Sequence, residues 1–165
     1  MLSWIRKVLL ATALTAVAAA LPAAPASASN GQPDLAAVRA ATDKYHVPDN
    51  AVNDGYTPFL NCFSDPALGG MGQHYVNFSL LNGSLDPLHP QAMVYQVGNG
   101  TELKLGAVEW IKPGAATDTP PQLFGRNFTY LPSLQVWVLH AWIWKPNPAG
   151  IFVNYNPAVS QCPTS

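Results

Sequence analysis

Two histidines and one glutamate are the residues of this chain best suited to metal binding or acid/base chemistry. His74, Glu109 and His140 each fall in a segment of alternating apolar residues, and each takes the apolar phase of its segment. Such alternation is typical of a strand with one buried face, so we expect all three side chains to point into the core. A buried carboxylate is costly without a charged or hydrogen-bonding partner, so we expect the three to meet.

Three kinds of chemistry fit this trio. Two imidazoles and one carboxylate are the ligand set of a divalent transition-metal site with open coordination positions. Glu109 and His140 would also suit metal-free acid/base chemistry. A purely structural cluster, with Glu109 accepting hydrogen bonds from both histidines, fits equally. The three residues form no short motif, so the sequence leaves these alternatives open.

Three other residues are weaker candidates. Met71 lies near His74 in the sequence and would add a soft ligand for copper, although it also reads as a buried anchor in a flexible turn. His46 ends a predicted helix and His89 precedes a proline in a loop, so we expect both in solvent.

The elements that must position the trio are mostly strands. Apolar residues at three- and four-residue spacing predict one helix over 34–45, followed by a loop over 51–72 with its most flexible point at Gly-Gly-Met-Gly. From His74 onward the period changes to two, which predicts strands over 74–81, 92–97, 101–111, 122–130, 134–145 and 151–155. The expected fold is mainly β (α+β), an N-terminal helix followed by an antiparallel β-barrel or roll of about six strands.

Composition narrows the function classes. The chain has 165 residues, of which 10% are charged, and its formal net charge is −1. The length suits one domain, and the charge excludes a basic nucleic-acid binder or a polybasic membrane-surface protein.

The first 28 residues have the pattern of a signal peptide. Arg6 and Lys7 precede an apolar run that ends at Pro22, and Ala26-Ser27-Ala28 supplies a small-x-small cleavage pattern. A retained membrane anchor is the alternative, but the run is short for a membrane span. We therefore expect a secreted domain over 29–165, released to the exterior or the periplasm.

Two cysteines, Cys62 and Cys162, are present. In an oxidising compartment they predict one disulfide, whereas free thiols or a cysteine metal ligand are the alternatives. The bond would join the C-terminal tail to the segment just before the first predicted strand.

A second function class rests on aromatic residues. Exposed aromatic rings beside asparagines would suit stacking on sugars, which predicts a non-enzymatic interaction or glycan-binding protein. The rings concerned are Trp137, Trp142, Trp144 and Tyr155. Burial of Trp142 and Trp144 would count against this function.

A set of short motifs spans nearly all of the predicted mature chain. They occupy residues 40–46, 54–56, 69–77, 85–87, 106–110, 123–125, 139–144, 147–150 and 156–157. Together they resemble those of a family of small secreted proteins of actinobacteria and some proteobacteria. The resemblance implies kinship and a bacterial origin, and no particular activity. The family pattern has an acidic residue where this chain has Gln91.

Overall fold

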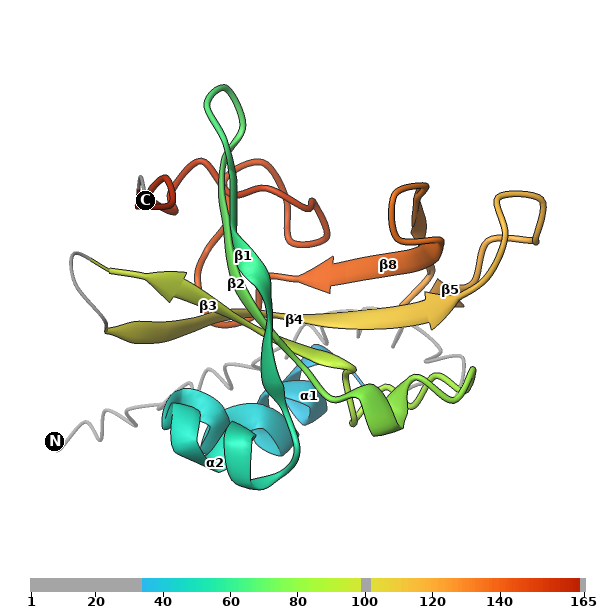
Figure 1. Cartoon of the computed structure of the whole chain (residues 1–165), viewed down its shortest axis with the longest axis horizontal. Coiled ribbons are helices and arrows are strands. Elements are labelled where there is room, and N and C mark those ends of the chain that lie inside the picture. The colour runs from blue at the N-terminus through green and yellow to red at the C-terminus, as the bar shows by residue number, and fades with distance from the viewer. Residues whose placement is uncertain (1–33, 99–101, 164–165) are drawn as a thin grey trace, which may run out of the picture.

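The computed structural model describes residues 34–98 and 102–163, which form a curled antiparallel sheet with helices against one face (Figure 1). The strand order is β1-β2-β3-β4-β8-β7, and the sheet curls into a half-barrel. The strands are β1 (Thr57–Asp65), β2 (Gly69–Val76), β3 (Ala92–Val97), β4 (Leu103–Pro113), β7 (Thr129–Leu131) and β8 (Val136–Ala141). This confirms the predicted mainly-β class with an N-terminal helix.

The helical region continues further than the sequence predicts. Helix α1 (Leu35–Thr42) begins at Asp34, whose carboxylate caps it by accepting a 2.9 Å hydrogen bond from the amide of Ala37. A 3-10 turn, η1 (Asp43–His46), follows, and then α2 (Pro48–Asn53), which begins at a proline already suited to the first helical turn. The predicted helix end at His46 is therefore a turn of the chain, and the helical part continues beyond it into α2.

Four predictions about strands and loops are corrected. Strand β1 lies within the residues predicted to form a loop. None of its residues is fully buried, so it lacks the alternating pattern that predicts a strand with one buried face. Residues 122–130 form a separate ribbon of β5 (Gln122–Leu123) and β6 (Arg126–Asn127) before β7 begins. Residues 151–155 are not a strand, and residues 78–80 form the 3-10 turn η2 (Phe78–Leu80) rather than the end of β2.

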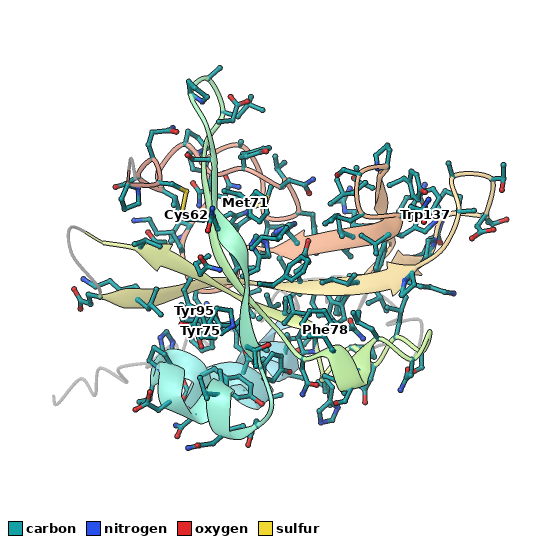
Figure 2. All side chains as sticks on the ribbon, viewed as in Figure 1. Cys62, Met71, Tyr75, Phe78, Tyr95 and Trp137 are labelled. Atoms are coloured by element: carbon teal, nitrogen blue, oxygen red, sulfur yellow. A yellow bond between two sulfur atoms is a disulfide. The ribbon has the colours of Figure 1, made fainter. Side chains whose placement is uncertain are left out.

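The sheet separates two apolar regions. The helices cover one face, where Tyr95 lies between sheet and helices (Figure 2) and donates a 2.9 Å hydrogen bond to the carbonyl of Tyr45. The C-terminal tail covers part of the other face, where Val94, Ala107 and Trp142 pack with Val159. A third group, Val76, Ala92, Ile111 and Val138, lies on the strands beyond that covered part.

A bulge sets which residues of β4 reach the tail-covered face. Ala107 pairs with Val94 and Leu105 pairs with Tyr95, so Gly106 is an extra residue between them. Ala107 packs toward the tail, whereas Leu105 joins the core under the helices. The regular alternation predicted for the strand over 101–111 is therefore interrupted at Gly106 and holds from Ala107 onward.

The disulfide between Cys62 and Cys162 is present, with Cα atoms 5.7 Å apart. It holds the C-terminal tail against β1 itself rather than against a segment before the first strand. Nearby, the amide of Cys162 donates to the Ser64 hydroxyl and the Gln161 side chain donates to the Asp65 carbonyl. The tail is thus fixed covalently and by hydrogen bonds across the end of the sheet.

The Gly-Gly-Met-Gly segment is part of β2 and not a flexible loop point. The amide of Gly70 donates to the carbonyl of Val159, and its carbonyl accepts from the amide of Asn156. Gly72 has φ +107, and a Cβ there would lie 2.4 Å from the carbonyl oxygen of Tyr95. These glycines let the tail and β3 approach the backbone of β2 closely.

Gly70→Ala is expected to lower the free energy of unfolding by about 1–3 kcal/mol, as overpacking does in other cores. The added Cβ would lie 2.4 Å from the carbonyl oxygen of Ser160 and 2.6 Å from Cγ1 of Val159, so the tail must shift. Denaturant unfolding measures the change. Gly98→Ala is the control, because its nearest contact would be an ordinary 3.5 Å, and equal losses from both would contradict the close-approach explanation.

Residues 1–33 and 99–101 lie outside the described part of the chain, so the predicted signal peptide is not described. Strands β3 and β4, on either side of 99–101, pair antiparallel. Within the described residues, no helix is long and apolar enough to span a membrane.

Candidate metal centre

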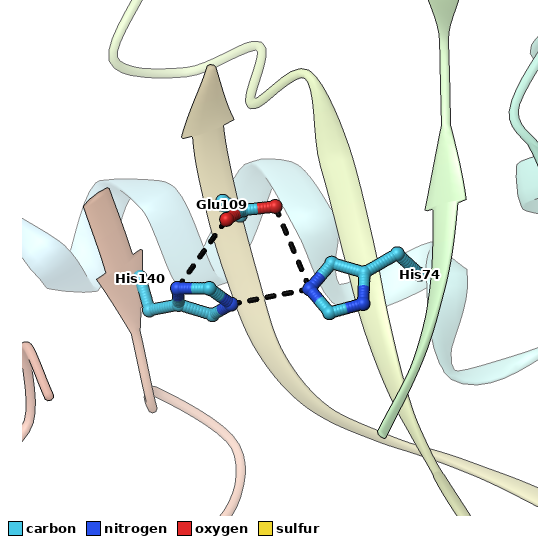
Figure 3. A group of neighbouring side chains, drawn as sticks. All are labelled: His74, Glu109 and His140. Carbon is cyan, nitrogen blue, oxygen red and sulfur yellow. Dashed lines mark hydrogen bonds and ion pairs between the residues drawn. The ribbon is translucent and has the colours of Figure 1, made fainter. Parts of the chain in front are cut away.

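His74, Glu109 and His140 meet on the sheet face away from the helices (Figure 3). His74 Nε2 lies 3.5 Å from Glu109 Oε2, and His140 Nδ1 lies 3.4 Å from Glu109 Oε1. The two histidine Nε2 atoms are 3.2 Å apart. All three residues are at least 95% buried, so the predicted convergence in the core is confirmed.

The pairing of the strands explains the contact between Glu109 and His140, which face each other directly across β4 and β8. His74 has further to reach. Strand β2 is separated from β8 by β3 and β4, so their backbones would lie about 14 Å apart in a flat sheet. The curl shortens this span on the concave face.

His74 and Glu109 contact each other diagonally across β3. His74 pairs with Val94 on β3, whereas Glu109 pairs with Ala92, two residues away. Their side-chain atoms lie 3.5 Å apart, so the two side chains reach toward each other across β3. No local sequence pattern predicts this contact.

Burial controls the charges of the cluster. It raises the pKa of Glu109 to about 8, and it lowers the pKa of His74 to about 4 and that of His140 to about 3. Near pH 7 all three groups are therefore neutral, with the proton on the carboxyl.

The separations suit a metal ion. Bonds of about 2.0–2.1 Å at the tetrahedral angle place two ligand atoms about 3.3–3.4 Å apart. The closest pairs of donor atoms here are 3.2–3.5 Å apart, with His140 and Glu109 contributing different atoms to different pairs. One ligand atom from each residue lies within 4.8 Å of the other two. The cluster could hold a metal ion without large movement of its strands.

The hydrogen bonding of the rings is incomplete in the described residues. Nδ1 of His74 and Nδ1 of His140 are buried and make no hydrogen bond there. Gly72 and Asn154 are polar neighbours that raise the pKa of His74 and His140 respectively, but burial outweighs them. Buried polar atoms without partners are uncommon in native proteins and point to a group that completes them.

Asn154 is a neighbour that sequence reasoning missed. It belongs to the 151–155 segment, which crosses the sheet as irregular chain instead of pairing as a strand. Trp142 holds this segment, because its amide donates to the Ile151 carbonyl and its indole donates to the Val153 carbonyl. The contact is long-range, so no local pattern could have indicated it.

An apolar pocket of about 370 Å³ adjoins the cluster. His74 and Glu109 contribute to its wall, together with Met71, the predicted soft ligand. The other lining residues are Phe59, Phe63, Val76, Phe78, Leu81, Ile111, Leu131, Ser133, Leu134, Val136, Val138 and Tyr155. A metal ion at the cluster would therefore lie at the edge of a space large enough for a small ligand.

The remaining candidates are not at this site. His46 and His89 are exposed, as expected; His46 packs edge-on against Trp144, and His89 pairs with Asp86. Trp137 and Trp142 are buried, and Trp144 is half-buried beside Arg39. Of the rings on which glycan binding was predicted to depend, Trp137 and Trp142 are therefore covered, whereas Trp144 and Tyr155 are half-buried.

Gln91, which departs from the resembled pattern, has a structural role. Its side-chain amide donates to the carbonyl oxygens of Leu80 and Ser84, and its side-chain oxygen accepts from the amide of Ile111. It is buried and ties the turn after β2 to β4.

No family model, curated protein or solved structure matches this chain. The function therefore has to be argued from the geometry of the cluster and its pocket.

Proposed function

We propose that the protein is exported and binds a divalent transition-metal ion through His74, Glu109 and His140. The observation that carries the proposal is the convergence of three buried donors beside a pocket, with one ligand atom from each residue within 4.8 Å of the other two. Three protein ligands leave coordination positions open for water or a ligand.

Export rests on two observations of different kinds. The first 28 residues have the pattern of a cleaved signal peptide. The Cys62–Cys162 disulfide is typical of proteins that fold in an oxidising compartment. A bacterial origin and kinship with the resembled secreted family remain predictions.

A structural polar cluster is the principal competitor, and it predicts no metal binding at any pH. The glycan-binding function is disfavoured in part, because Trp142 is buried whereas Trp144 is half-buried.

Calorimetric titration of the purified protein with Zn²⁺, Cu²⁺ and Mn²⁺ tests the proposal. We expect one ion per chain for at least one metal, with affinity weakened more than about 100-fold in His74→Ala and in His140→Ala. That magnitude follows because loss of an outer-shell partner alone costs about 10- to 100-fold. At pH 7 binding should release about one proton, since Glu109 must ionise to coordinate.

His46→Ala and His89→Ala are the matched controls, because both histidines are exposed and distant from the cluster in the fold. They should retain the affinity of the parent protein. Absence of binding by the parent, or an equal loss in His89→Ala, would leave the cluster as a structural feature. Circular dichroism of each variant separates loss of a ligand from loss of the fold.

A further inference from the structure

The pocket beside the cluster has one polar region and otherwise apolar walls. Its lining includes one imidazole, that of His74, and one carboxyl group, that of Glu109, and within the described chain no lysine or arginine lines it. Phe78 is 53% exposed and Leu134 is 41% exposed, although both contribute to the walls. Exposed apolar side chains at a pocket are typical of a surface that an apolar ligand covers.

The charge of an occupied metal site selects the polar group of such a ligand. A divalent ion bound by one ionised carboxylate and two neutral imidazoles carries a net charge of +1. Charge in an apolar environment is costly unless it is paired, so an open coordination position favours a singly charged anionic oxygen donor. A carboxylate satisfies both conditions.

The volume sets the size of the apolar part. About 370 Å³ accommodates about a dozen non-hydrogen atoms if each takes roughly the 30 Å³ of a liquid water molecule. Ser133 and Tyr155 are the other polar residues of the lining, which offers few partners for a sugar or another hydroxyl-rich ligand. The chemistry therefore fits an unbranched or aromatic body of about eight to ten carbons.

We propose that the metal centre takes a small apolar monocarboxylate, whose carboxylate binds the ion and whose apolar body fills the pocket between Phe78 and Leu134. This rests on the proposed function, because the carboxylate needs the ion at His74, Glu109 and His140. It extends that function from metal binding to recognition of a ligand class.

The test is calorimetric titration of Zn²⁺-loaded and metal-free protein with acetate, butanoate, hexanoate, octanoate and 1-octanol, after the Zn²⁺ titration itself. From butanoate to octanoate, each added CH2 should tighten binding to the loaded protein about fourfold, the effect of burying one methylene. Octanoate should bind metal-free protein at least tenfold more weakly, and 1-octanol should bind loaded protein at least tenfold more weakly than octanoate does.

Leu134→Glu tests the pocket without changing a ligand. The new carboxylate should repel the anion and oppose burial of its chain, weakening octanoate binding at least tenfold while Zn²⁺ affinity is unchanged. Val52→Glu is the matched control, because Val52 is 48% exposed, lies in α2 and does not line the pocket. It should alter neither affinity.

The two proposals fail separately. If Zn²⁺ binds but octanoate binds no more tightly than acetate, or 1-octanol binds as tightly as octanoate, the proposed ligand class is wrong and the metal site stands. If octanoate binds loaded and metal-free protein equally, coordination by the ion is wrong. If neither Zn²⁺ nor the other metals bind, the proposed function is overturned, and the recognition of carboxylates through the ion is overturned with it.

Discussion

Replacing Cys62 and Cys162 together by serine is expected to lower the free energy of unfolding by about 4–5 kcal/mol, the value that chain entropy gives for a closed loop of this length. The bond spans 100 residues, so the intact disulfide excludes a large set of extended unfolded conformations. Denaturant unfolding of the parent protein and the double variant measures the difference.

Reduction supplies the control for the cysteine variant. A reductant should bring the parent to the stability of the double serine variant and leave that variant unchanged. Thiol titration of denatured, unreduced protein should find no free thiol. Two free thiols, or equal stability of parent and variant without reductant, would contradict the assigned bond.

The second large effect is a dependence of stability on pH that Glu109 imposes on the metal-free protein. In the unfolded chain its carboxyl ionises near pH 4.5, but burial raises the pKa in the folded chain to about 8. Between these values the unfolded state has lost a proton that the folded state keeps, so stability falls as pH rises, by about 1.4 kcal/mol per pH unit. The whole interval amounts to roughly 4–5 kcal/mol.

His74 and His140 act in the opposite direction. Their pKa values are about 4 and 3 in the folded chain against 6.5 when unfolded, so they stabilise the fold above pH 6.5 and lose that effect as pH falls toward 4. Above pH 6.5 the contribution of Glu109 acts alone within the cluster. We therefore expect the cluster's contribution to stability to be greatest near pH 6.5.

Glu109→Gln isolates the carboxyl term, because the amide has a similar shape and never ionises. Unfolding curves of both proteins, recorded with a chelator from pH 4 to 9, give the difference in stability at each pH. As the pH rises from 4 to 9, the stability of Glu109→Gln relative to the parent protein should increase by roughly 4–5 kcal/mol. A difference independent of pH would show that Glu109 is ionised in the folded chain throughout.

Local patterns predicted the parts of this molecule that local forces determine. The helix start at Asp34, strand β3 and the burial of Glu109 and His140 follow from capping and alternation, which act within a few residues. The disulfide followed from the pairing of two cysteines with a predicted export signal. The convergence of His74 on the other two could be proposed only because buried charged groups need partners.

The incorrect parts depend on contacts between distant segments. Gly-Gly-Met-Gly has the composition of a loop, but it is a strand because the tail and β3 pack on its backbone. Residues 151–155 alternate like a strand, yet Trp142 holds their carbonyl groups and no strand pairs with them. The curl of the sheet and the diagonal contact of His74 with Glu109 across β3 likewise arise from the assembled sheet, and no local pattern predicts them.

The position of the disulfide also affects what a protease could do to this protein. Residues 115–120 are exposed between β4 and β8, and exposed loops are the preferred sites of cleavage. A single cut there separates the segment carrying His74 and Glu109 from the segment carrying His140. Cys62 belongs to the first piece and Cys162 to the second. The nicked protein would therefore remain one covalent molecule that still carries His74, Glu109 and His140.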